Sequence, residues 1–262
     1  MILVGTAGFK YEDWRGAFYP PTLRDSDMLA FYAQEFPVLE IDYTYYKMPF
    51  ARTLDAMARK TPASFEFCVK AHKTMTHEVP PDEGSQQLVF AQFMEAVKPL
   101  EEQGKLGCVL LQFPWGFKPA RESMRYIERL HELCGERPAV VEFRNSAWVK
   151  EETFGLLKKT GLGYCCVDEP KLHGLMPPVA IATSKIGYVR FHGRNAAKWW
   201  AHGTASERYD YLYSNDDLQE WLPRIVSLQD QTDKVFVLFN NCHEGKAAIN
   251  ARDMTSLVEA MR

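Results

Sequence analysis

The stretch VVEFRNSAW, residues 140–148, decides the fold because it alternates apolar and charged side chains. Successive side chains of a β-strand point to opposite faces, so Val141 and Phe143 share one face while Glu142 and Arg144 share the other. Charges inside a protein are costly unless they are paired or bind a ligand. This pattern is typical of a barrel strand whose inner face reaches a polar mouth.

Similar short apolar runs recur along the whole chain and predict eight strands. They fall at residues 2–8, 38–46, 64–72, 106–114, 139–145, 164–170, 186–194 and 234–241. Helical patterns lie between most of them, at 25–36, 53–60, 85–103, 121–134, 151–160, 215–228 and 246–261. Eight strands alternating with helices predict an α/β fold, a single (β/α)8 TIM-like barrel that forms one domain over residues 1–262.

Two features refine this prediction. Residues 171–185 are Pro-rich and poorly helical, so we expect a degenerate sixth helix connection. A doubly wound sheet is the alternative fold, but the first strand leads into GTAGFKYEDW, which is not a G-x-G-x-x-G dinucleotide-binding motif.

The composition of the chain indicates its cellular compartment and the classes of partner that it could bind. The net charge of −3 does not favour nucleic acid as a partner, although a local basic patch could still bind it. The six cysteines include no CxxC pair, which is typical of a reducing compartment. No apolar run reaches about 18 residues and the start resembles no signal peptide, so we expect a cytoplasmic protein with no membrane contact.

Cationic residues on the inner faces of three strands suggest an anionic ligand. Arginine presents a planar fork that suits phosphate or carboxylate. The predicted anion-binding residues are Lys70, Arg144, Arg190 and Arg194. The alternative is that each cation only neutralises an interior carboxylate, which would make the charged interior purely structural.

A second group could transfer protons. Glu142, Asp168 and His192 lie on three consecutive predicted strands and are the candidate catalytic residues. Such side chains can also bind hard metal ions, but H-x-H and H-E-x-x-H spacings are absent, so no metal site is predicted and the cofactor stays unknown. Further residues at strand ends or in the following loops are predicted to contact the substrate: Asn240, Asn241, His243, Gln112, Trp14, Tyr46 and Trp148.

As an ordered set, several segments resemble the DUF72 (YecE-like) family. The segments are GTAGFKYEDWRGAFYP (5–20), LEIDYTYYKMP (39–49), FCVKAHKTMTH (67–77), LLQFP (110–114), VEFRNSAW (141–148), VRFHGR (189–194) and FNNCHEGKAAINA (239–251). The resemblance covers nearly the whole chain and implies a TIM-barrel-type fold, with a sugar-isomerase relationship as an analogy at the level of the fold. The chain departs from the usual pattern at Ala7, Phe9, Asp42, Asn145 and Ala147.

Two functional hypotheses follow. The first is an enzyme, a hydrolase, lyase or isomerase, that acts on a small anionic, phosphorylated or carbohydrate-like substrate at the C-terminal end of the barrel. The second is a nucleotide- or nucleic-acid-binding module without chemistry. The Trp-rich segment 194–211 could form a lid or a partner surface in either case. The oligomeric state is not predicted.

Overall fold

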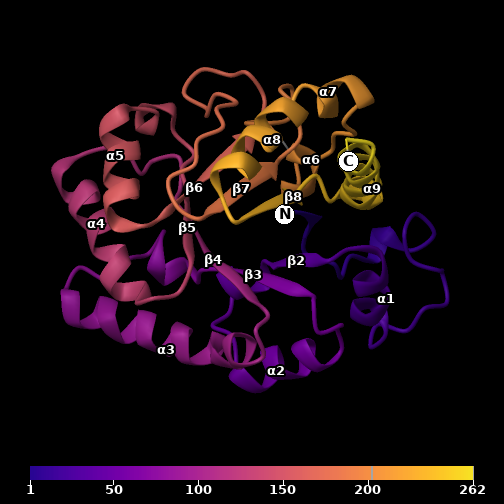
Figure 1. The fold of residues 1–262 in the computed structure, drawn as a ribbon, viewed down its shortest axis with the longest axis horizontal. Helices are drawn as coiled ribbons and strands as arrows, with labels where there is room; N and C mark the ends of the chain where they lie inside the picture. The colour runs from indigo at the N-terminus through magenta and orange to yellow at the C-terminus, as the bar shows by residue number, and fades with distance from the viewer. Residues whose placement is uncertain (202, 262) are drawn as a thin grey trace.

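The computed structural model describes residues 1–201 and 203–261 and contains a closed barrel of eight parallel strands. The strands run in chain order around the barrel, with β8 closing onto β1 (Figure 1). They are β1 (Ile2–Ala7), β2 (Val38–Ile41), β3 (Glu66–Lys70), β4 (Leu106–Gln112), β5 (Ala139–Glu142), β6 (Gly163–Asp168), β7 (Ile186–Phe191) and β8 (Lys234–Phe239). The predicted (β/α)8 fold is therefore confirmed.

Helices surround the barrel, and most of them match the predicted positions (Figure 1). They are α1 (Met28–Glu35), α2 (Ala51–Arg59), α3 (Glu83–Glu102), α4 (Arg121–Cys134), α5 (Glu151–Thr160), α6 (Ala205–Arg208), α7 (Asn215–Gln219), α8 (Leu222–Gln231) and α9 (Lys246–Glu259). The predicted helix 215–228 is two helices: α8 begins at Leu222, and Pro223 lies in its first turn, where a proline is tolerated. Residues 169–185 contain no helix, as the degenerate sixth connection predicted.

The alternation read from residues 140–148 holds in the structure. Phe143 faces outward and stacks on Trp148 with ring centroids 4.3 Å apart, while the Glu142 side chain is buried in the barrel interior. The strands are shorter than predicted. Lys70, Gln112 and Glu142 are the last residues of β3, β4 and β5, and His192 directly follows β7. Loops after these ends form the barrel mouth.

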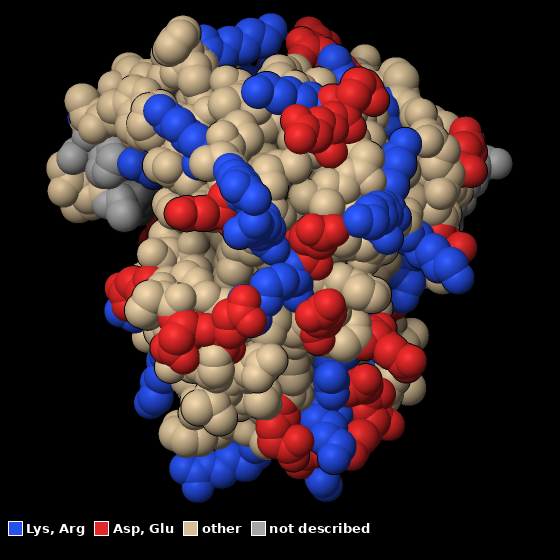
Figure 2. Space-filling view, turned by 90° about the vertical axis from the view of Figure 1, so that its left-hand side faces the viewer, with Lys and Arg blue, Asp and Glu red and all other residues tan. Residues whose placement is uncertain are grey.

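The outer surface mixes charges of both signs. Figure 2 shows Lys and Arg side chains interspersed with Asp and Glu side chains over one face of the molecule, with no broad area of a single sign. No helix among the described residues is long and apolar enough to span a membrane.

Candidate functional site

A dense ion-pair network fills the interior of the barrel near the C-terminal ends of the strands. Arg190 of β7 is fully buried and donates to Glu40 of β2 through Nε (3.0 Å to Oε2) and Nη2 (2.5 Å to Oε1). Its Nη1 donates to Glu142 Oε2 of β5 at 2.7 Å. The Tyr188 hydroxyl completes the set by donating to Glu40 Oε2 at 2.7 Å. The Arg190 guanidinium thus joins opposite sides of the barrel.

Glu142 is the acidic centre of this network. Its Oε1 lies 3.0 Å from His192 Nε2 and 2.5 Å from Arg144 Nε. Burial alone would raise the pKa of Glu142, but Arg144, Arg190 and His192 together hold that pKa well below its usual value. Glu142 is therefore a fixed negative charge. It lies below the two mouth cavities described in this section and is not among their lining residues, and its predicted catalytic role stays a prediction.

Both ring nitrogens of His192 make hydrogen bonds. Its Nε2–H donates to Glu142, and its Nδ1 lies 3.0 Å from the Asn240 side-chain amide, which donates to it. Complete burial, aided by the positive charge of Arg144, lowers the pKa of His192 to about 3. The neutral imidazole therefore lies below the mouth as a hydrogen-bonded link between Glu142 and Asn240, and its predicted proton-transfer role stays a prediction.

Burial also raises the pKa of Glu40, although the Arg190 guanidinium opposes this rise and the neighbouring Asp42 carboxylate adds to it. Asp42 follows β2, and its Oδ1 lies 3.8 Å from Arg190 Nη2. The purely structural interpretation of the sequence is thus supported for Arg190. This arginine is fully enclosed by carboxylates, so it is not available to a ligand.

Asp168 and Arg194 form a separate cluster outside the barrel interior, contrary to the sequence prediction. The Asp168 carboxylate accepts from Arg194 Nε and Nη2 (2.9 and 2.8 Å), Tyr213 Oη (2.7 Å) and Trp221 Nε1 (2.7 Å). Arg194 also pairs with two further carboxylates, Asp217 at 2.7 Å and Glu220 at 2.9 Å. These contacts fasten α7 and α8 to the strand ends.

The physical reason for this correction is local geometry. Cys165, Val167 and Glu169 share the inner face of the β6 segment, so Asp168 between them faces outward. The chain turns sharply at Gly193, where φ is +86°, so the alternation of β7 ends before Arg194.

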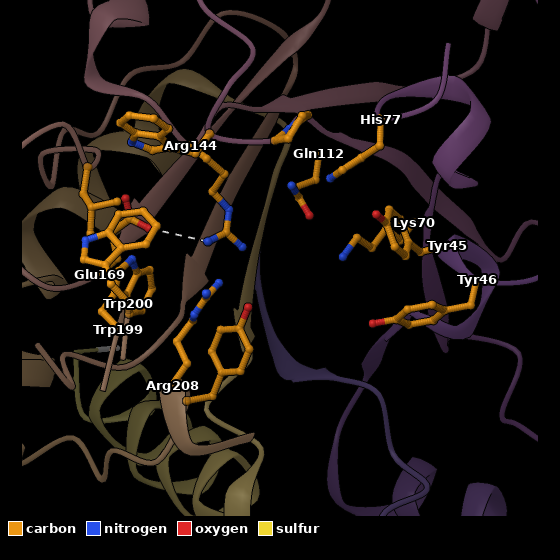
Figure 3. Close-up of a pocket in the computed structure, with 14 residues that line it drawn as sticks. Tyr45, Tyr46, Lys70, His77, Gln112, Arg144, Glu169, Trp199, Trp200 and Arg208 are labelled. Atoms are coloured by element: carbon orange, nitrogen blue, oxygen red, sulfur yellow. Dashed lines mark hydrogen bonds and ion pairs between the residues drawn. The ribbon is translucent and has the colours of Figure 1, made fainter. Parts of the chain in front are cut away.

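A cavity of about 310 Å³ opens above this network. Its walls come from loops after several strands and from the segment around α6: Tyr45, Tyr46, Lys70, His77, Gln112, Pro114, Trp115, Arg144, Glu169, Leu175, Trp199, Trp200, Arg208 and Tyr209. Figure 3 shows Arg144 and Arg208 reaching toward the cavity from one side and Lys70 from the other. Among the predicted residues, Lys70, Arg144, Tyr46 and Gln112 meet here.

The cations of this cavity are incompletely neutralised. Within the described chain, Lys70 and Arg208 have no carboxylate within 4.0 Å. Lys70 Nζ instead lies 5.0 Å from the Tyr45 ring centroid, and Arg208 lies over Trp199 and Trp200. Among the described residues, the buried Nε of Arg208 has no hydrogen-bond partner.

Arg144 is held by carboxylates but remains at the cavity wall. Besides Glu142, its Nη1 lies 3.5 Å from Glu169 Oε2. Burial raises the pKa of Glu169 to about 7, although Arg144 and the Met176 backbone N–H (2.7 Å to Oε1) oppose the rise. The charge that faces Arg144 from this side therefore titrates near neutral pH.

His77 is another titratable group in the wall of this cavity with a shifted pKa. Burial first, and then the positive charges of Lys70 and Arg144, lower the pKa of His77 to about 4. Its Nδ1 lies 2.9 Å from Thr76 Oγ1, and its ring packs edge-on against Tyr45 with centroids 4.9 Å apart. The imidazole is thus neutral and fixed in orientation.

Aromatic rings close much of the cavity. Trp115 and Trp200 approach edge-to-face with centroids 6.0 Å apart, and Trp115 Nε1 donates to Gly174 O at 3.1 Å. Tyr46 is 77% exposed at the entrance. These rings offer flat apolar surfaces beside the cations.

A second cavity of about 300 Å³ adjoins the first and shares Tyr46, Lys70 and Tyr209 with it. Its remaining walls include two predicted contact residues, Asn240 and His243, together with Tyr11, Asp13, Asp42 and Cys242.

Three other predicted contact residues have structural positions instead. Trp14 is fully buried and donates Nε1–H to Cys242 O at 2.7 Å, and Trp148 is equally buried and donates to Phe117 O at 2.7 Å. Asn241 is buried and donates to Tyr211 O and Asn250 Oδ1. The sequence prediction placed these residues at the mouth from their proximity to strand ends alone.

Several residues that line the first cavity were not predicted from the sequence as site residues. Glu169 could have been found by following the alternation of β6 one residue further. Arg208 and Tyr209 belong to the segment 194–211, whose path over the mouth is not encoded in any strand periodicity.

Within residues 1–201 and 203–261, no group of three or more His, Cys, Asp or Glu side chains is arranged to hold a metal ion. The interior carboxylates already bind arginine, which leaves the first cavity with cations as its main charged groups. Its donor set therefore fits an anion better than a cation.

Comparison with other proteins gives consistent similarity along the chain. A family described as "Protein of unknown function DUF72" matches residues 3–262. The UPF0759 protein YunF of Bacillus subtilis (strain 168) is 34% identical over 273 residues, covering 99% of this chain and 95% of that protein. A crystal structure of a DUF72 family protein from Thermotoga maritima MSB8 has a TM-score of 0.90 and 38% identity, with 99% of each chain covered. Another, from Enterococcus faecalis V583, has a TM-score of 0.88 and 25% identity, covering 99% of this chain and 96% of that chain.

Proposed function

Because the chain belongs to the DUF72 family of proteins of unknown function, we propose a function from its own cavity. We propose that it is an enzyme that acts on a small anionic, phosphorylated substrate bound between Lys70, Arg144 and Arg208. The reaction belongs to the hydrolase, lyase or isomerase classes, in which a proton moves to or from the substrate.

One observation carries the proposal: two cations that have no carboxylate partner in the described chain border the first cavity, next to a third cation, Arg144. Positive charges so close together repel one another, and an anion between them relieves that repulsion. The planar guanidinium of arginine donates two directed hydrogen bonds to a phosphate group, and the flexible lysine side chain adds a positive charge that can follow it. The two residue types together therefore suit a phosphate. The fixed ion pairs below the cavity hold Arg144 in place for this contact.

Proton transfer is assigned to His77. If Nδ1–H donates to Thr76 Oγ1, then Nε2 keeps a lone pair and can take a proton from a bound substrate. An anion that neutralises Lys70 and Arg144 removes two of the causes that lower the pKa of His77. Substrate binding therefore moves this pKa upward, toward the range where a histidine serves as acid and base.

Glu169 is a second titratable group at this cavity, because burial raises its pKa to about 7. Its carboxylate is covered by neighbouring side chains and touches the cavity from behind Arg144. Its role in the proposal is to adjust the net charge beside Arg144 rather than to touch the substrate.

A binding module without chemistry is the second candidate. The aromatic wall formed by Trp115, Trp199 and Trp200 supports it, since such rings can stack on a nucleotide base. Long nucleic acids are disfavoured, because the net charge is −3 and the Lys and Arg side chains on the face in Figure 2 are interspersed with Asp and Glu.

Calorimetric titration with phosphate monoesters and with inorganic phosphate tests the proposal. Wild-type protein should bind, and Lys70→Met and Arg208→Met should each weaken binding by at least about tenfold, a loss of about 1.4 kcal/mol. The matched control is Lys159→Met, which removes an exposed lysine paired with Glu128 on the outer helices and should bind as the wild type does. Equal binding by all four proteins, or none by the wild type, would overturn the proposed function.

A further inference from the structure

The two adjoining cavities at the barrel mouth differ in the chemistry of their walls. The first contains Lys70, Arg144 and Arg208 as cations, with Glu169 as its carboxylate. The second contains two carboxylates, Asp13 and Asp42. Among its described lining residues, the lysine or arginine side chain is that of Lys70, on the wall that the two cavities share. A ligand that extends through both therefore meets positive charge at one end and hydrogen-bond acceptors at the other.

Asp42 is the most informative residue of the second cavity. Its side chain is 23% exposed, and its Oδ1 is buried without a hydrogen-bond partner in the described structure. The guanidinium of Arg190 lies 3.8 Å away and is already occupied by Glu40 and Glu142. This oxygen is out of a ligand's reach, whereas the exposed part of the Asp42 side chain borders the second cavity and can accept a hydrogen bond from a ligand there.

The remaining polar groups of the second cavity both donate and accept. Asn240 gives one amide N–H to His192, and its side-chain oxygen accepts from no other described residue. Tyr46 and Tyr209 bring hydroxyl groups to the shared wall, and His243 brings an imidazole. Alcohol groups donate and accept in the same way, so such a wall matches a chain or ring that carries several hydroxyls.

An ammonium group fits this second cavity less well. It can only donate, whereas the wall also supplies donors. The Lys70 ammonium on the shared wall would repel it at close range.

We propose that the ligand is a sugar phosphate that spans both cavities, with its phosphate in the cationic cavity and its hydroxyl groups against Asp42 and Asn240. This inference rests on the proposed function and specifies its substrate class. Lys70 lies between the two cavities and contacts the ligand where the phosphate joins the carbon skeleton. The exposed Tyr46 ring covers this junction from the entrance.

The proposal predicts that one substitution affects two probes differently. Asp42→Ala removes a negative charge near Lys70, so inorganic phosphate should bind with unchanged or tighter affinity. The same substitution removes the acceptor for sugar hydroxyls, so a sugar phosphate should bind about tenfold more weakly or worse. Asp42→Asn keeps the size of the side chain and one oxygen beside Arg190, and should shift both affinities in the same directions by smaller factors.

The experiment is calorimetric titration of inorganic phosphate and of a panel of five- and six-carbon aldose and ketose phosphates. At least one sugar phosphate should bind wild-type protein about tenfold more tightly than inorganic phosphate does. Asp55→Ala serves as the control and should change neither affinity, because it removes a partly exposed α2 carboxylate that contacts Arg59 and Gln103 on the outer helices.

The outcomes separate the two proposals. Phosphate binding that depends on Lys70 and Arg208, with no sugar phosphate binding more tightly and no effect of Asp42→Ala or Asp42→Asn, would overturn this inference and leave the proposed function intact. Absence of both phosphate and sugar-phosphate binding would overturn the two together. Weaker sugar-phosphate binding in the Asp42 variants, with phosphate binding retained, would support both.

Discussion

At the scale of single residues, the charged groups of the barrel divide into two kinds. Arg190 and Glu142 are buried and satisfied by one another and by Glu40, so they belong to the folded framework. Lys70 and Arg208 border a cavity and lack carboxylate partners in the described chain. The same residue types therefore contribute to stability in the barrel interior and are available for binding in the cavity above it.

Replacing Arg190 tests the framework role. Arg190→Met should lower the free energy of unfolding by about 3–5 kcal/mol, because it leaves Glu40 and Glu142 as buried carboxylates without their shared cation. Urea unfolding followed by far-UV circular dichroism measures the change, with Lys159→Met as the control whose midpoint should not move. A midpoint for Arg190→Met equal to that of the wild type would contradict the structural role.

The pH dependence of anion binding tests His77. Its pKa is about 4 in the free protein, and a bound anion favours the protonated ring and raises that pKa. Binding therefore takes up a proton, so affinity should increase as the pH falls through the raised pKa and should level off below about pH 4. Sulfate is the suitable probe, because it stays a dianion throughout this range.

Two variants separate the groups that titrate here. His77→Gln should remove the increase in sulfate affinity at low pH. Glu169→Gln should remove the part of the increase near pH 7, where the neutralised carboxyl stops competing for Arg144. Identical pH profiles for wild type and His77→Gln would exclude the proton-transfer assignment.

At the scale of elements, the strand pattern carried most of the predictable information. Alternation along β2, β3, β5 and β7 correctly indicated that Glu40, Lys70, Glu142 and Arg190 face inward. The prediction failed for Arg194 because Gly193 turns the chain, and for Asp168 because an inner-facing and an outer-facing carboxylate are adjacent in sequence. Whether an inner charge meets a partner or a cavity depends on residues far away in the sequence, which no local pattern encodes.

The close approach of β1 to β2 gives a prediction at this scale. A Cβ atom on Gly5 would lie 2.1 Å from Val38 O, so Gly5→Ala must push the two paired strands apart. We expect it to lower the free energy of unfolding by at least about 3 kcal/mol. Gly155→Ala is the matched control: this exposed α5 position has nothing within 4 Å of the added methyl group, so stability should rise by about 0.5–1 kcal/mol in urea unfolding.

At the scale of the whole molecule, closure of the barrel links the two ends of the chain. β1 pairs with β8 over five register positions, from Ile2 with Val235 to Thr6 with Phe239. The mouth is assembled from loops that follow nearly every strand, so the cavity exists only when the whole barrel is closed. The sequence predicted this architecture well because it depends on the repeated alternation of strand and helix patterns.

Closure predicts cooperative unfolding of the described chain as one unit. Buried tryptophans lie at distant points around the barrel, among them Trp14, Trp148 and Trp221. Thermal unfolding followed by tryptophan fluorescence and by far-UV circular dichroism should therefore give coincident single transitions. Two separated transitions would contradict a single domain over residues 1–262.

The central claim is that the cavity between Lys70, Arg144 and Arg208 binds an anion. Its most direct test is anomalous diffraction from crystals of the protein soaked in tungstate, a heavy analogue of phosphate. The account predicts a dominant anomalous peak in this cavity, with oxygens at about 3 Å from Lys70 Nζ and the guanidinium groups. Tungstate bound only elsewhere, with this cavity empty at saturating concentration, would contradict it.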